Sequence, residues 1–292
     1  MKIVKVKGGL GNQLFQYAFG KRLNQIVDDD VKYDMSSYQY LAEDSIRRPR
    51  IMKFNVNLKI ATQDELNALC LFSHKGKLTS TKYRIGIGLE AALNRKYYFE
   101  KDRAYRNPES LQKYSYFDGY WQSWRTIDKV WSELKEELIP NYSINAETQK
   151  MIDKVSNHNS VFVGVRKGDY TDSINHYGEF RQNYYDKAMN YILDRVPNPV
   201  FYIFSNDISW VKNNLSFNGK TVVYREPKDI IDDFEDLLIM ANCRHSIMVN
   251  STYHWWGAKL KDYEGKIVVA PSKWFFDDKP IDILPPHWVK MS

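Results

Sequence analysis

Short apolar runs alternate with amphipathic segments in the second half of the chain, and this alternation restricts the possible folds more than any other feature. The apolar or β-branched runs lie at 161–165, 200–204, 221–224, 246–249 and 266–270. Apolar residues at helical spacing lie between them, at 184–196, 230–243 and 255–260. Short buried strands connected by helices predict right-handed βαβ units and a parallel sheet.

Three polar clusters directly follow strands of this predicted sheet. They read RKGDY at 166–170, SND at 205–207 and NST at 250–252. The carboxyl ends of parallel strands lie at one edge of a sheet, and ligands of α/β proteins bind in the crevice there. The sequence therefore predicts one binding site built from residues that are far apart in the chain.

Side chains in and near these clusters suit a nucleoside diphosphate. Arg166 can bind a diphosphate through two parallel hydrogen bonds, and Asp169 can fix its loop or accept a proton. Ser251 and Thr252 can donate to a phosphate at a helix N-terminus, and Asp236 can accept from a guanine base. Simpler explanations stay open. Arg166 and Asp169 could form a surface ion pair, and Ser251 and Thr252 could cap a helix. Asp236 could lie on a solvated helix face.

The first half of the chain is less regular. Strands are expected at 2–6 and 31–33, and helices at 12–27 and 123–138. The stretch 71–107 has weak periodicity and receives no assignment. A link at Pro140–Tyr142 divides the chain into an N-terminal α/β domain at 1–142 and a C-terminal α/β domain at 143–292.

A glycine-rich turn joins the first predicted strand to the first helix. Residues 7–20 read KGGLGNQLFQYAFG. The turn does not match the dinucleotide fingerprint GxGxxG, because Leu14 occupies the third glycine position, and it lacks the GK[ST] of a P-loop. It still offers backbone amides at a helix N-terminus to a ligand, but a turn required only for packing explains the residues equally well.

Charge and composition narrow the range of partners. The chain of 292 residues carries a formal net charge of +6, which favours an anionic ligand or the anionic face of a membrane. No basic run or recognition-helix pattern indicates a nucleic-acid partner. Aromatic residues make up 15% of the chain; most are expected in the core, although such rings also stack on sugars.

No metal site is predicted. The two cysteines, Cys70 and Cys243, and the scattered histidines lack metal-ligand spacing. Asp28–Asp30 resembles the DxD of some metal-dependent nucleotide-sugar transferases, but it follows a helix and precedes a strand, so a solvated turn is favoured. The distant cysteines, with no signal peptide and no apolar stretch of spanning length, predict a reduced, cytoplasmic protein.

Six motifs in order resemble glycosyltransferase family 11, the bacterial-type α-1,2-fucosyltransferases. They read GGLGNQLFQYAFG at 8–20, DGYWQSW at 118–124, RKGDY at 166–170, YIFSND at 202–207, DLLIMANCRHSIMVNSTYHWWGAKL at 236–260 and IVVAPSKWF at 267–275. The resemblance covers nearly the whole chain and implies a GT-B fold, in which two Rossmann-like α/β domains face each other across a crevice. It further implies GDP-fucose as the donor, a sugar hydroxyl as the acceptor, inversion at the fucose anomeric carbon, and no metal or other cofactor.

The resemblance also implies roles for individual residues. Arg166 corresponds to the arginine of the family motif HxRxGDY, which is expected to hold the donor diphosphate. Asp169 is the first candidate for the general base, and Glu179 and His176 are the alternatives. The predicted donor-binding set comprises Gly9, Asn12, Arg166, Asp207, Asp236, Asn250, Ser251 and Thr252. Its first two members belong to the N-terminal, acceptor-side domain and the others to the C-terminal, GDP-fucose-binding domain.

Three departures from the family pattern bear on the substrates. Gly164 replaces the histidine of HxRxGDY, so a guanine or ribose contact from that side chain is lost and the donor geometry changes. His254 and Lys259 replace the serine and the last tryptophan of the usual NSTFSWWGAW. These departures point to a divergent acceptor preference.

The resemblance leaves the substrates partly open. The favoured acceptor is the 2-hydroxyl of a galactoside in a surface glycan. A lipid-linked acceptor at the inner face of the membrane fits the basic charge, which would also support peripheral association with that membrane. The alternatives are a transferase with another nucleotide sugar or linkage, and a non-catalytic sugar-binding protein that uses the aromatic residues.

Overall fold

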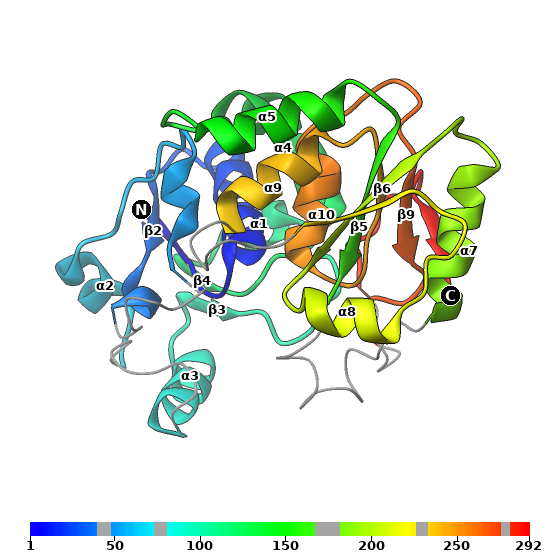
Figure 1. Cartoon of the computed structure of the whole chain (residues 1–292). Coiled ribbons are helices and arrows are strands. Elements are labelled where there is room, and N and C mark those ends of the chain that lie inside the picture. The colour runs from blue at the N-terminus through cyan, green and yellow to red at the C-terminus, as the bar shows by residue number, and fades with distance from the viewer. Residues whose placement is uncertain (40–47, 73–80, 167–181, 226–232, 276–280) are drawn as a thin grey trace. The chain divides into compact units, whose positions relative to one another are not determined.

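The computed structural model describes residues 1–39, 48–72, 81–166, 182–225, 233–275 and 281–292, and these form two compact units (Figure 1). Unit 1 comprises Met1–Asn141 and a short later segment that ends at Ile283. Unit 2 comprises the rest of the chain from Tyr142 onward. The division lies one residue before the predicted boundary at 142/143, and the return of the later segment to unit 1 was not predicted.

Unit 1 is built on a parallel sheet with the strand order β2-β1-β4-β3. Its strands are β1 (Lys2–Lys5), β2 (Val31–Asp34), β3 (Tyr97–Phe99) and β4 (Tyr116–Asp118). Its α-helices are α1 (Leu10–Ile26), α2 (Gln63–Leu69), α3 (Thr81–Leu93) and α4 (Trp124–Glu137). Since β1 is flanked by β2 and β4, the turn that follows β1 lies at the centre of the carboxyl edge of this sheet.

Unit 2 is built on a larger parallel sheet with the strand order β10-β9-β8-β5-β6-β7. Its strands are β5 (Ser160–Val165), β6 (Val200–Ser205), β7 (Val222–Arg225), β8 (His245–Ile247), β9 (Val268–Pro271) and β10 (Val289–Met291). Its α-helices are α5 (Ala146–Ser156), α7 (Gln182–Leu193), α8 (Ile208–Asn214), α9 (Asp233–Asn242) and α10 (Thr252–Lys259).

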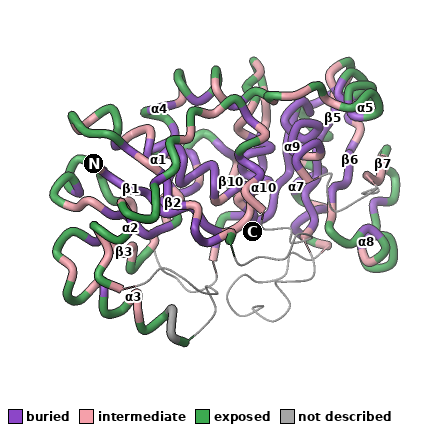
Figure 2. Tube along the Cα trace, turned by 90° about the vertical axis from the view of Figure 1, so that its left-hand side faces the viewer, coloured by how far each residue is buried: buried purple, intermediate pink, exposed green. Residues whose placement is uncertain are grey.

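Helices cover both faces of the unit 2 sheet, which explains why its strands read as continuous apolar runs. Along β5 the side chains alternate between the faces. Val161, Val163 and Val165 pack in one apolar cluster with residues of α7 and α8. Phe162 faces the other side, where its ring lies 6.2 Å from the ring of His254 on α10. Figure 2 shows β5, α9 and α10 as largely buried, whereas much of α3 and α8 is exposed.

The predicted α/β class, with two parallel-sheet units, is confirmed, whereas the facing of the units across a crevice stays a prediction. The helix predicted at 12–27 begins earlier, at Leu10, because Gly9 occupies the N-cap position. Trp255 and Trp256 are fully buried, as expected for core residues. The unassigned stretch 71–107 contains α3 and β3. Within the described residues no helix is both long and apolar enough to cross a membrane.

Candidate functional site

Arg166 and Ser251 meet at the carboxyl edge of the unit 2 sheet. Arg166 directly follows β5, and Ser251 follows the neighbouring strand β8 and precedes α10. The guanidinium Nη1 of Arg166 donates to Ser251 Oγ at 3.4 Å, and Ser251 is 1% exposed. The predicted convergence of these two residues is therefore confirmed, while their role in binding stays a prediction.

Ser251 occupies the N-cap position of α10, but its side chain makes no capping hydrogen bond. The capping explanation for this hydroxyl is therefore wrong, because Ser251 Oγ accepts from Arg166 instead. Thr252 begins the helix and is half-buried. The first turn of α10 thus combines the positive end of a helix dipole with an arginine, a combination that attracts phosphate oxygens.

Asn250 and Asp207 hold local structure at the same edge of the sheet. The buried amide Nδ2 of Asn250 donates to the carbonyl of Trp274 at 2.9 Å and so fixes the segment after β9. Asp207 follows β6 and caps α8, with its Oδ1 accepting from the backbone N–H of Trp210 at 2.8 Å. These bonds orient both side chains. The predicted contact of the two residues with the sugar-nucleotide donor stays a prediction.

Asp236 lies in the first turn of α9 and forms an ion pair with Arg225 at the end of β7. The distance between Arg225 Nε and Asp236 Oδ1 is 2.8 Å, and each side chain is 16% exposed. A solvated helix face therefore does not describe Asp236. The ion pair orients the carboxylate that was expected to bind a guanine base, and its partner Arg225 was not predicted.

The described part of the chain stops at Arg166 and resumes at Gln182. Asp169, the first candidate for the general base, lies outside the described residues, and so do the alternatives Glu179 and His176.

Gly164 and His254 occupy one shared space beside Arg166. A Cβ built on Gly164 would lie 2.6 Å from Cε1 and 2.8 Å from Cγ of His254, and closer still to Nδ1. His254 is 5% exposed, and its Nδ1 has no hydrogen-bond partner within the described residues. Burial, assisted by the nearby positive charge of Arg166, lowers the pKa of His254 to about 3. The imidazole is therefore neutral at physiological pH.

In unit 1 the glycine-rich turn needs a glycine at position 8 rather than at position 9. Gly8 has a φ of +83°, and a Cβ there would lie 2.8 Å from Asn12 Nδ2. Gly9 is extended, and a Cβ there would meet no atom of the described residues within 4 Å. The backbone at Gly9 is therefore open to close approach. Asn12 Oδ1 accepts from Gln122 Nε2 at 2.9 Å, which links the turn to the DGYWQSW motif.

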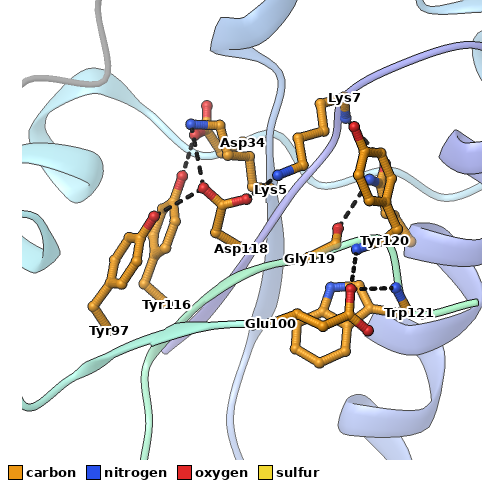
Figure 3. A network of polar contacts seen from close by, with 11 residues as sticks. Lys5, Lys7, Asp34, Tyr97, Glu100, Tyr116, Asp118, Gly119, Tyr120 and Trp121 are labelled. Carbon is orange, nitrogen blue, oxygen red and sulfur yellow. Dashed lines mark hydrogen bonds and ion pairs between the residues drawn. The ribbon is translucent and has the colours of Figure 1, made fainter. Parts of the chain in front are cut away.

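A buried polar network lies beneath this turn at the carboxyl ends of the unit 1 strands (Figure 3). Asp118 at the end of β4 forms ion pairs with Lys7 and with Lys5, whose Nζ is 3.8 Å from Asp118 Oδ2. Its Oδ2 also accepts a hydrogen bond from the Tyr97 hydroxyl at 2.8 Å. Burial alone would raise the pKa of Asp118, but the charges of Lys7 and Lys5 outweigh burial and lower the pKa to about 2.

Glu100 extends the network toward the surface. Its Oε2 accepts from the backbone N–H groups of Tyr120 at 2.6 Å and Trp121 at 3.2 Å, and so shapes the turn after β4 (Figure 3). Burial raises the pKa of Glu100, although the two amide bonds oppose the shift. This carboxylate is half-buried beside Tyr120, which is 43% exposed, and its raised pKa makes it a stronger proton acceptor than a free carboxylate.

Several of these residues were not predicted from the sequence. Lys7 directly precedes the motif at 8–20 and Asp118 begins the motif at 118–124, so both could have been recognised from their positions. Glu100 lies in the unassigned stretch 71–107. Among the described residues no group of three or more histidine, cysteine or acidic side chains could hold a metal ion. Asp30, from the DxD-like run, forms an exposed ion pair with Lys59 at 2.7 Å, as a solvated turn would.

The sequence model of glycosyl transferase family 11 matches residues 1–292. The chain belongs to glycosyltransferase family 11. This family 11 chain is 28% identical to an α-1,2-colitosyltransferase of Escherichia coli, with 99% of this chain and 98% of the relative covered. It is 24% identical to the galactoside α-(1,2)-fucosyltransferase 2 of Gorilla gorilla gorilla, over 62% of this chain and 56% of the relative.

The solved structures that align with the family 11 chain share little sequence with it. The fucosyltransferase NodZ from Bradyrhizobium aligns with a TM-score of 0.46 at 13% identity, over 88% of this chain and 91% of NodZ. The Escherichia coli ADP-heptose heptosyltransferase II aligns with a TM-score of 0.45 at 12% identity, over 99% of this chain and 92% of that protein.

Proposed function

We propose that this family 11 chain is an inverting transferase that moves L-fucose from GDP-β-L-fucose to the 2-hydroxyl of a galactoside, without a metal. The observation that supports this most is the pairing of Arg166 with Ser251 at the first turn of α10. A guanidinium and a helix N-terminus together supply the donors and the positive potential that a leaving diphosphate requires. The names of the relatives support a fucosyl-like sugar and a 1,2 linkage.

In the proposed reaction the acceptor hydroxyl attacks C1 of the fucose from the side opposite the diphosphate. The bond between C1 and the diphosphate oxygen breaks, GDP leaves, and the new bond to the acceptor oxygen has the α configuration. Arg166 and the N-terminal amides of α10 stabilise the charge that develops on the diphosphate, because they are oriented before the reaction starts. A carboxylate accepts the hydroxyl proton; Asp169 remains the first candidate.

The donor sugar and the linkage have alternatives, because one relative is a colitosyltransferase. A transfer assay with GDP-fucose over a panel of galactosides, followed by linkage analysis, tests the proposal, and the expected product carries an α-1,2-linked fucose. Isothermal titration with GDP, UDP and fucose separates the classes. Preferred binding of GDP without added metal supports the transferase, whereas fucose binding without GDP binding would indicate a sugar-binding protein.

Peripheral association with an anionic membrane is also part of this proposal, and α3 is the surface that favours it. Ile85, Leu89 and Leu93 recur every fourth residue and are 58%, 39% and 61% exposed. The exposed charged side chains described on and just after α3 are Arg84, Arg95 and Lys96, all basic. The acidic residue of the helix, Glu90, is buried. An exposed apolar stripe flanked by basic residues matches anionic lipid headgroups and the acyl boundary beneath them.

Acidic substitution of this stripe should release the protein from membranes. We expect Ile85→Glu/Leu93→Glu to lower binding to phosphatidylserine-containing vesicles by about tenfold, because burial of each apolar side chain is lost and a negative charge is added. Co-sedimentation measures the bound fraction, and Leu193→Glu, at a leucine on α7 that is 41% exposed, is the control. Equal binding of both variants to these vesicles would exclude α3 as the contact surface.

A further inference from the structure

Position 164 lies in the buried strand β5 of unit 2, yet it carries no side chain. All six residues of β5 are buried, and its other residues on this face and the opposite one are apolar or hydroxylated. A glycine inside a buried strand loses packing and weakens the strand, so it usually marks a close approach by another group. Here that group is the ring of His254, which lies where a side chain on Gly164 would be.

The geometry of the ring shows which part of it fills this space. The atoms Cγ, Nδ1 and Cε1 of His254 lie against Gly164, which leaves Nε2 and Cδ2 on the ring edge away from the strand. His254 is the third residue of α10, in the same first turn that begins beside Ser251. The imidazole therefore stands between the sheet and the helix N-terminus, close enough to Arg166 for that charge to act on its pKa.

Packing alone does not account for a histidine at this position. An apolar side chain would fill the same space without burying a nitrogen, and buried polar groups that lack partners are destabilising. Within the described residues, Nδ1 of His254 is such a group. Both members of the pair, a glycine in a strand and a buried imidazole, thus reduce stability, which is typical of positions retained for binding.

We propose that His254 is a donor-binding residue, whose imidazole replaces the side chain missing at Gly164 and contacts the nucleoside diphosphate beside Arg166. This inference rests on the proposed function. It treats two departures from the family pattern as one change, because the ring of His254 on the facing helix lies where a side chain at position 164 would begin. The sequence-based expectation that this contact is lost with Gly164 is revised accordingly.

Three variants at one position separate binding from packing. His254→Phe keeps a ring in the space and removes both nitrogens, while His254→Asn and His254→Gln each restore an amide at about the position of one nitrogen. We expect His254→Phe to weaken GDP binding about tenfold, the worth of one hydrogen bond to a charged group, with little change in melting temperature. We expect one of the amide variants to recover affinity and thereby identify the nitrogen that binds.

An exchange of side chains tests the shared space directly. Gly164→His alone should lower both the melting temperature and GDP affinity, because two imidazoles cannot occupy one site. The double variant Gly164→His/His254→Ser returns the imidazole to the strand and should bind GDP within about threefold of wild type. The effects of the two substitutions on GDP affinity would then be strongly coupled, because the second one restores what the first one removes. His287→Phe, at an exposed histidine of unit 2, is the control for the loss of an imidazole elsewhere.

Isothermal titration with GDP and thermal unfolding are measured on the full chain for every variant. Absence of GDP binding by the wild type would overturn the proposed function and this inference together. Wild-type GDP affinity in His254→Phe would overturn the inference alone, since the ring would then be packing only. A double variant no better than Gly164→His would overturn the exchange of positions.

Discussion

Replacement of Arg166 by alanine is expected to lower the rate of fucosyl transfer by about two to three orders of magnitude. The guanidinium is oriented by Ser251 Oγ at 3.4 Å and stands at the first turn of α10, where charge develops on the diphosphate as GDP departs. Loss of one such oriented donor typically costs about 3 to 4 kcal/mol of transition-state stabilisation, which is the basis of the expected rate. Steady-state transfer from GDP-fucose measures it.

The effect should fall on kcat at least as strongly as on the KM for the donor, because the interaction strengthens as the diphosphate leaves. Arg166→Lys should recover only part of the rate, since a lysine keeps the charge but cannot form two parallel hydrogen bonds. Arg195→Ala, at an exposed arginine beyond α7, is the matched control. Near-normal turnover by a folded Arg166→Ala variant would remove Arg166 from the donor site.

The architecture of unit 2 could be predicted because its strands are buried on both faces. The runs at 161–165 and 200–204 agree with β5 and β6 to within one residue at each end. Parallel pairing of β5 with β8 then brings Arg166 and Ser251 together, as the order of strands and helices required. Topology, rather than any single motif, made this part of the site predictable.

Unit 1 was harder to predict for two physical reasons. Its strands β3 and β4 contain only three residues each, too few for an alternating pattern to be recognised. The helix α3 directs its apolar residues, such as Ile85 and Leu93, toward solvent, so their spacing does not mark a face that packs in the core. The buried network around Asp118 consists of charged residues, which sequence patterns normally place at the surface.

The pairing of Gly164 with His254 could not be predicted from one sequence, although both departures from the family motif were visible. Each departure, taken separately, suggests a lost or altered contact. Only the approach of α10 to β5 shows that one ring fills the space left by one glycine. Whether a large side chain at one position fills the space left by a small one far away in the chain depends on the distance between them in the fold. Local sequence patterns carry no information on that distance.

Replacement of Asp118 by asparagine is expected to lower the free energy of unfolding by about 3 to 5 kcal/mol at pH 7, because it removes the carboxylate that pairs with two buried lysines. Lys5 and Asp118 are fully buried, and Lys7 is nearly so. The neutral amide keeps the size of the side chain but leaves positive charge in a low-dielectric site. Urea unfolding measures the change, and Asp30→Asn, in the exposed pair with Lys59, should have no measurable effect.

The pH dependence provides an independent check on the same ion pairs. The folded-state pKa of Asp118 is about 2, below its ordinary value of 3.8, so the contribution of Asp118 is fully present above pH 3.8 and is lost as the pH falls toward 2. The difference in unfolding free energy between wild type and Asp118→Asn should therefore shrink over this interval, while the other carboxylates affect both proteins equally. A difference that stays constant down to pH 2 would show that Asp118 does not carry the charge that holds Lys5 and Lys7.

The network supports the backbone of the glycine-rich turn through Lys7, so a folded Asp118→Asn variant should also lose order at Gly8 and Gly9.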